Sequence, residues 1–186
     1  MARDLPASVT PAAAAPIFPR LLGARFDNLP PTVRRLHVRP GLQRWRGEVE
    51  VERGRGWLSR LCAWATRLPP AGRGPIVVDI DAAPEREQWT RHVAGHAMRS
   101  TLRAERGLLC ERLGLVEFGF VLDAADGVLL WRVARVRALG VPLPARWFDQ
   151  VVAREFERDG RYGYDVAAHL PLAGLLVHYR GWLDGA

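Results

Sequence analysis

The sequence contains no lysine, only two cysteines and few serines, and none of its apolar runs is long. All 27 basic residues are therefore arginines, and they are spread along a chain of formal net charge +7. Runs such as VEFGFVL and AGLLV are too short to span a bilayer, and two cysteines among apolar neighbours do not make a disulfide framework. We therefore predict a cytoplasmic protein without a membrane span, and the scattered arginines disfavour a dedicated nucleic-acid site.

Several catalytic and metal-binding motifs are also missing. No G-x-S-x-G sequence occurs, so no serine hydrolase elbow is present. The glycines of ERGRGW lack the lysine of a phosphate-binding loop. His92 and His96 fall in an expected strand, where residues four apart lie about 13 Å from each other, too far to share one ion. We therefore predict neither a metal site nor a cofactor.

The composition is that of a globular protein, with 48% hydrophobic and 25% charged residues. Residues 1–16 are rich in Ala and Pro and offer no apolar face, so we predict a flexible tail there. Residues 17–186 are expected to form a single α+β domain. It begins with a short helical segment in which Val33, Leu36 and His37 share one face and a proline at 30 or 31 starts a helix.

The clearest helical pattern lies at residues 57–68. Trp57, Leu61, Trp64 and Leu68 recur at the spacing of one helix face, and two prolines follow. This pattern predicts one main helix whose tryptophan face packs on the core.

The remainder of the chain predicts strands. Trp45, Val49 and Val51 alternate with charged residues, as in a strand with one wet face. Asp126-Gly127 and Asp159-Gly160 are typical of tight hairpin turns. We predict about eight strands in a curled, largely antiparallel sheet or partial barrel, because a flat sheet of that size leaves exposed edges. The helix at 57–68 would cross its mouth, and the interior would be either a filled core or a cavity.

The last predicted strand, LLVHYRGWL, combines polar and aromatic residues. Alternation places His178, Arg180 and Trp182 on one face and Val177 and Tyr179 on the other. The polar face could bind an acidic or aromatic ligand through a guanidinium, an indole and an imidazole. Alternatively it is the solvent side of an ordinary strand, and we favour this second interpretation.

Two functional hypotheses follow from these residues. The first, which we favour, is a non-enzymatic domain with a pocket for a small apolar or amphipathic ligand, lined by several of the seven tryptophans. The second is an enzyme or substrate-handling module in which Glu155 and His178 form an acid–base pair. The candidate ligand-binding residues are Glu111, Arg132, Glu155, His178, Arg180 and Trp182.

The chain also resembles a known family. LPPTVRRLH, RGRGWLSRLCA, GLLCERLG, AREFERDGRYGYDV and LPLAGLLVHYRGWL, in this order, are similar to the bacterial domain-of-unknown-function family four-one-six-six. Members of that family occur alone or fused to domains resembling NAD-dependent epimerases or saccharopine dehydrogenases. The resemblance implies an accessory role and adds a third hypothesis, a scaffold that docks an oxidoreductase partner, with a filled interior and an exposed apolar patch.

Overall fold

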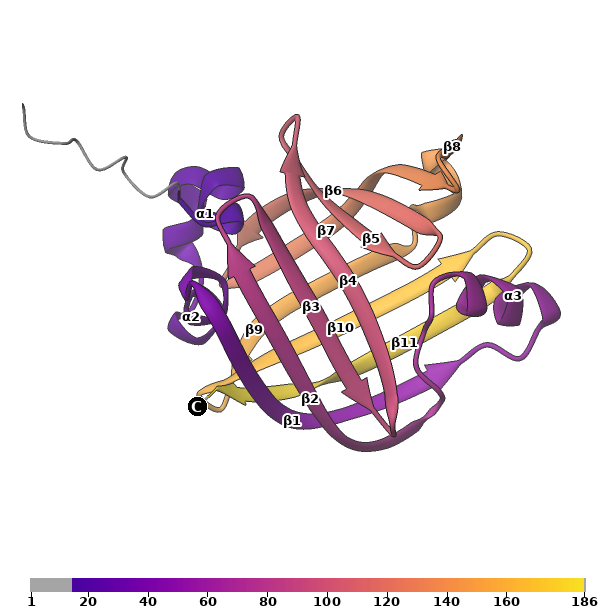
Figure 1. Ribbon diagram of the computed structural model, residues 1–186, viewed down its shortest axis with the longest axis horizontal. Coiled ribbons are helices and arrows are strands. Elements are labelled where there is room, and N and C mark those ends of the chain that lie inside the picture. Colours follow the sequence, from indigo (N-terminus) through magenta and orange to yellow (C-terminus); the bar gives the residue numbers. More distant parts are fainter. Residues whose placement is uncertain (1–14, 186) are drawn as a thin grey trace, which may run out of the picture.

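The chain folds as a closed antiparallel β-barrel. The computed structural model describes residues 15–185. Eleven strands form one sheet, and the pairing of β6 with β7 closes ten of them into a ring, while β8 is added at the edge of β7 (Figure 1). The strands are β1 (Gly41–Arg53), β2 (Gly72–Ala83), β3 (Arg86–Val93), β4 (His96–Glu105), β5 (Leu108–Leu113), β6 (Val116–Ala125), β7 (Val128–Ala138), β8 (Val141–Leu143), β9 (Val151–Arg158), β10 (Arg161–Leu170) and β11 (Gly174–Gly185).

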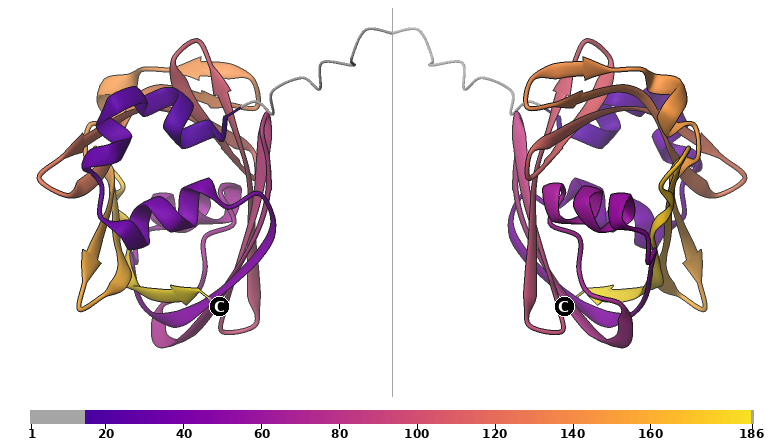
Figure 2. Two further views of the ribbon diagram at one scale, coloured as in Figure 1. Left: turned by 90° about the vertical axis from the view of Figure 1, so that its left-hand side faces the viewer. Right: turned by 90° about the vertical axis from the view of Figure 1, so that its right-hand side faces the viewer.

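Short helices lie at both ends of the barrel. One end carries α1 (Ile17–Leu22), η1 (Gly23–Asn28) and α2 (Pro31–Val38), and the other carries α3 (Trp57–Ala65) (Figure 2). A further short helix, η2 (Ala145–Phe148), precedes β9. Apolar side chains of α1 and α2 join the barrel core, so these helices close their end. None of the helices in the described part of the chain is both long and apolar enough to cross a membrane.

The alternation in the sequence accounts for the barrel wall. In β1, Trp45, Val49 and Val51 are buried while the residues between them are wholly or partly exposed, as predicted. The turns at Asp126-Gly127 and Asp159-Gly160 join β6 to β7 and β9 to β10, which confirms both hairpins.

The prediction of about eight strands in a partial barrel was wrong in number and in closure. The segment around Ala94-Gly95 is a tight turn between β3 and β4, and Arg106-Gly107 is another between β4 and β5. In both turns, the residue before glycine takes a positive φ. Asn or Asp before glycine is the usual sequence signal of such a turn, and Ala and Arg do not give that signal. The sheet closes because a ring leaves no unpaired edge between its first and last strands.

The amino-terminal helical segment agrees with the prediction. Pro31 begins α2, and Val33, Leu36 and His37 form its buried face. Residues 1–14 of the predicted tail lie outside the described residues, as does residue 186.

Helix α3 is shorter than predicted, and the face that it buries is the opposite of the expected one. It ends at Ala65, where the Thr66 hydroxyl donates to the Cys62 carbonyl at 2.8 Å. Its buried residues are Ser59 and Ala63, whereas the predicted core residues Trp57, Leu61 and Trp64 are exposed.

The reason for this orientation is a close approach between α3 and β11. The Ser59 hydroxyl donates to the Leu175 carbonyl at 2.9 Å, and the backbone amide of Gly54 donates to the Leu176 carbonyl at 3.3 Å. A Cβ at Gly54 would stand 1.7 Å from the Leu175 oxygen. Small residues therefore face β11, and the large ones point to solvent.

Candidate functional site

The interior of the barrel contains a cavity of about 120 Å³. Most of its wall is apolar and aromatic, and it reaches Thr66 and Leu68, which follow α3. Three tryptophans are buried in the barrel, Trp45, Trp89 and Trp131, and two of them line the cavity. The cavity therefore has the apolar wall that a small-molecule pocket needs.

Polar side chains enter this wall from β3 and β5. Arg91 contacts Glu111 at 3.4 Å, donates to the Ser100 hydroxyl at 3.0 Å and lies 5.0 Å from the ring centre of Trp89. The side chains of Arg91 and Glu111 are only 11% and 8% exposed. Burial disfavours the charged guanidinium, but the pKa of Arg91 is nevertheless raised, and the negative charge of Glu111 is the largest cause of the rise. The arginine is therefore a fixed cation in the cavity wall.

A second polar group, Glu155 on β9, meets the cavity near the end closed by α1 and α2. One oxygen of its carboxylate lies 2.6 Å from Nε2 of His37 on α2, and the Tyr162 hydroxyl also bonds to this carboxylate. The His37 ring is fully buried and stacks on Phe18 at 3.6 Å between ring centres. Packing and hydrogen bonds thus hold Glu155 in one orientation.

The three tyrosines of the chain, Tyr162, Tyr164 and Tyr179, all line the cavity. Burial raises the pKa of each hydroxyl, to about 12 for Tyr179 and well above its ordinary value for Tyr162. These hydroxyls therefore stay protonated at neutral pH. That of Tyr164 donates to the Glu48 carbonyl at 3.3 Å, and that of Tyr162 bonds to Glu155.

The two tryptophans of this wall also carry indole N–H groups, and only one of these has a partner among the described residues. The indole N–H of Trp131 is buried and has no hydrogen-bond partner among the described residues. The indole N–H of Trp89 donates to Glu87 at 2.8 Å, and burial raises the pKa of Glu87, with His37 and this hydrogen bond opposing the rise. Trp131 thus lines the cavity and carries a buried donor without a partner in the described part of the chain.

The structure brings together only two of the six predicted ligand-binding residues. Glu111 and Glu155 face the cavity. Arg132 is exposed, and its neighbour Trp131 is the residue of β7 that points inward. The other three residues, in β11, lie on the outer face, so the favoured interpretation of this strand as polar toward solvent agrees with the structure.

The partners of these outer residues are all exposed or partly exposed. His178 contacts Asp165 at 3.0 Å, and Arg180 contacts Glu50 and Glu52 at 3.2 and 3.4 Å. The Trp182 ring lies under the Arg161 guanidinium at 4.3 Å. Glu155 and His178 therefore do not meet, and the predicted acid–base pair is not formed. The physical reason is alternation, because neighbouring residues of a barrel strand point to opposite sides of the wall.

Neither Arg91 nor the role of His37 was predicted from the sequence. Arg91 follows Glu87 and Trp89 at a spacing of two, so alternation places these three residues on one face of the strand. A face that combines Glu, Trp and Arg is, however, typical of an outer surface, and nothing in the sequence marks it as the inner one. His37 was placed on the buried face of its helix, yet its partner Glu155 is 118 residues away in the sequence.

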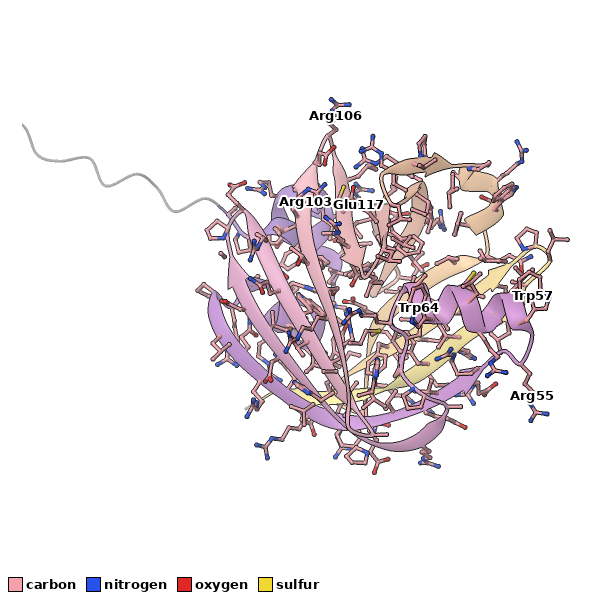
Figure 3. All side chains as sticks on the ribbon, turned by 45° about the vertical axis from the view of Figure 1, so that its right-hand side comes forward. Arg55, Trp57, Trp64, Arg103, Arg106 and Glu117 are labelled. Atoms are coloured by element: carbon pink, nitrogen blue, oxygen red, sulfur yellow. The ribbon has the colours of Figure 1, made fainter. Side chains whose placement is uncertain are left out.

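A cluster of metal-ligating types lies elsewhere, on the outer face of β4–β6. One ligand atom each from Glu105, Cys110 and Glu117 falls within 4.8 Å of the others. Arg103 contacts both carboxylates at 3.0 Å, and Figure 3 shows Arg103 and Glu117 pointing toward each other. Arg135 contacts Glu105 at 3.2 Å and the Cys110 sulfur at 3.1 Å. Two guanidinium groups thus neutralise the carboxylates, so this is an ion-pair network rather than a cation site.

A family model described as Domain of unknown function (DUF4166) matches residues 29–183. This span contains α2 and all but the last residues of the barrel. No curated protein is similar enough to the chain to count as a match. The resemblance noted in the sequence is confirmed, and the chain belongs to the DUF4166 family.

Proposed function

We propose that the protein binds a small, neutral, mainly apolar molecule inside the barrel. The observation that carries this proposal is the apolar cavity with Arg91, Glu111, Glu155 and three tyrosines in its wall. An interior that served stability alone would be filled with apolar side chains, since buried charges gain little over them. The cavity also weighs against the scaffold hypothesis, which predicted a filled interior.

The volume and the charges limit the ligand. A cavity of about 120 Å³ compares with the roughly 150 Å³ cavity that holds one benzene molecule, so a single ring or a short branched chain fits without movement. Arg91 is opposed by two carboxylates, Glu111 and Glu155, so an anion gains no net attraction. Trp131 in the wall carries a buried N–H without a partner in the described residues, which a small shift of the ring would offer to a ligand, and Glu155 offers an acceptor. A hydroxyl group on the ligand could use both kinds of contact.

The first experiment is native mass spectrometry of the freshly purified protein against its denatured mass. A reproducible extra mass would identify a molecule carried through purification. The same protein is then titrated calorimetrically with toluene, p-cresol and p-toluate, which share one ring and differ in polarity. We expect p-cresol to bind most tightly and p-toluate least. Absence of binding by all three, together with a bare native mass, would refute the proposal.

A cavity-filling variant tests the location. Ala153 lines the cavity, and a phenyl group there would occupy most of the space, so Ala153→Phe should abolish p-cresol binding. The matched control is Ala134→Phe on the exposed side of β7. Circular dichroism establishes that both variants fold. Equal p-cresol affinity in the two folded variants would place the ligand outside the barrel.

A further inference from the structure

The two ends of the barrel differ in the character of their turns. We use the name "α3 end" for one end of the barrel. It consists of α3, η2, β8 and the turns at 94–95, 114–115, 139–140 and 171–173. These turns contain only Ala, Gly, Leu and Pro. The turns at the opposite end contain the charged residues Glu85, Arg106, Asp126 and Asp159.

Exposed apolar side chains are concentrated at the α3 end. Of the eleven large hydrophobic residues that are exposed within the described part of the chain, eight lie there. On α3, Trp57 is 74% exposed and Trp64 is 71% exposed. Figure 3 shows both indoles projecting from the helix, with Arg55 extending away from the barrel. The eight are Trp57, Leu61, Trp64, Leu115, Leu139, Val141, Trp147 and Leu172.

Two of these residues occupy backbone positions that leucine rarely takes. Leu139 has φ 51° and Leu172 has φ 69°, and Leu172 is 97% exposed. At the opposite end, Asp126, Asp159 and Arg106 take the corresponding left-handed positions, so the side chains there are charged, and Asp is well suited to such a turn. Leucine in an exposed left-handed turn adds little to the turn or to the core, which favours a role for its side chain outside the folded domain.

The α3 end is also basic. No acidic residue occurs between Glu52 and Asp79, while this segment contains five arginines. A groove of about 820 Å³ opens beside α3, and its lining includes four arginines, His96 and Trp64 but no acidic side chain. Among the described residues, Arg55 and Arg60 form no ion pair. These cations are therefore available to an external anion.

We propose that the α3 end docks on the surface of an anionic phospholipid bilayer. Tryptophan is favoured at the boundary between headgroups and acyl chains, and a helix with an apolar face and flanking arginines lies in that plane. The basic groove matches the phosphate groups of the lipid, and each arginine near such a surface adds attraction. This proposal does not depend on the cavity holding a ligand.

A bilayer suits this end better than a protein partner does. The exposed apolar residues stand on α3, on three separate turns and on η2 and β8, as individual tips rather than as one flat patch. Separate tips can enter a fluid lipid layer independently. A protein interface instead needs a contiguous, well-packed centre.

The test is cosedimentation of the full chain with vesicles of phosphatidylcholine and phosphatidylglycerol, and with vesicles of phosphatidylcholine alone. We expect binding to the anionic vesicles to be at least about tenfold tighter and to weaken as salt rises. Trp57→Ser/Trp64→Ser should weaken this binding about tenfold or more, because each indole that enters the lipid contributes roughly one such factor. The matched control is Leu42→Ser/Val121→Ser, which removes exposed apolar side chains elsewhere.

The arginines are tested in the same assay. Arg55→Gln/Arg60→Gln should lower anionic-vesicle binding about tenfold, whereas Arg86→Gln/Arg106→Gln at the opposite end should not. Failure to bind anionic vesicles would overturn the proposal, and so would equal binding by all four variants. If vesicles do not bind but Trp57→Ser/Trp64→Ser dissociates a dimer in analytical ultracentrifugation, the α3 end is an interface between two copies and the proposal is wrong.

Discussion

The buried pair of Arg91 and Glu111 should show strong energetic coupling. Their charged atoms are 3.4 Å apart, which corresponds to about 5 kcal/mol of attraction at an effective dielectric constant of about 20. Removal of one partner leaves a charge near an apolar cavity. We expect Arg91→Met to cost about 3 kcal/mol of unfolding free energy and Glu111→Leu about 2 kcal/mol, because Arg91 keeps Ser100 and Trp89 as partners.

The double variant should be nearly as stable as the native chain, within about 1 kcal/mol, since neither charge then remains buried alone. The cycle therefore predicts a coupling energy of about 4 kcal/mol. Urea unfolding followed by circular dichroism measures all four proteins.

The control cycle uses Arg44 and Asp79, whose charged atoms are closer, at 2.6 Å, but whose arginine side chain is 60% exposed. Solvent should make that coupling a small fraction of the interior one. Similar coupling energies in the two cycles would refute the argument that burial, rather than distance, sets the strength of the interior pair.

Three further predictions concern stability and ionisation. Gly47→Ala should destabilise the barrel by about 3 kcal/mol, because its Cβ would stand 1.8 Å from the Trp182 carbonyl oxygen, whereas Gly74→Ala in neighbouring β2 meets no atom within 4 Å and should be tolerated; equal urea midpoints would contradict this. The native protein should show no tyrosinate absorbance in an ultraviolet titration until the pH approaches about 12, because burial raises the pKa of all three tyrosines, and a native transition near the ordinary value of about 10 would show that one is exposed. Burial raises the pKa of Glu87 above its ordinary 4.5, so in the window above that value the folded state holds more protons than the unfolded state, and the unfolding free energy falls as pH rises. Glu87→Gln should remove this part of the decline and be relatively more stable at neutral pH, as urea unfolding at several pH values would show, and an unchanged slope would count against a buried Glu87.

Local patterns in the sequence predicted local structure well and the closed arrangement only in part. The alternation of β1 and the Asp-Gly turns identified strands and hairpins, because those signals depend on neighbouring residues. The turn at Ala94-Gly95 was missed, since its geometry comes from the pairing of whole strands rather than from a favoured turn residue. The apolar stripe of α3 predicted a buried face and was wrong, because a helix in tight contact with β11 must turn its small residues inward.

The candidate site was harder to predict for a related reason. Glu111 and Glu155 were identified as polar residues within apolar strands, but which face of a strand is the interior depends on closure of the ring. The same alternation that excluded His178 from the interior brought Tyr179 into it. Arg91 and His37 are important because of their partners on other elements. These partners are distant in the sequence, so a local repeat of residues cannot predict the contacts.

The stability cycle and the proposed function support each other through the cost of the interior charges. Apolar residues of similar volume in place of Arg91 and Glu111 would stabilise the barrel about as well as the pair does. The pair therefore adds little to the folding free energy, yet it lies in the wall of the cavity beside Tyr162, Tyr164 and Tyr179. A role in ligand binding explains why charged residues occupy these positions. The double variant separates the two roles, because it should keep its native stability while its affinity for p-cresol changes. If both the stability and the p-cresol affinity were unchanged, the ion pair would have no part in binding, and the ligand would have to be held by Glu155, Trp131 and the tyrosines.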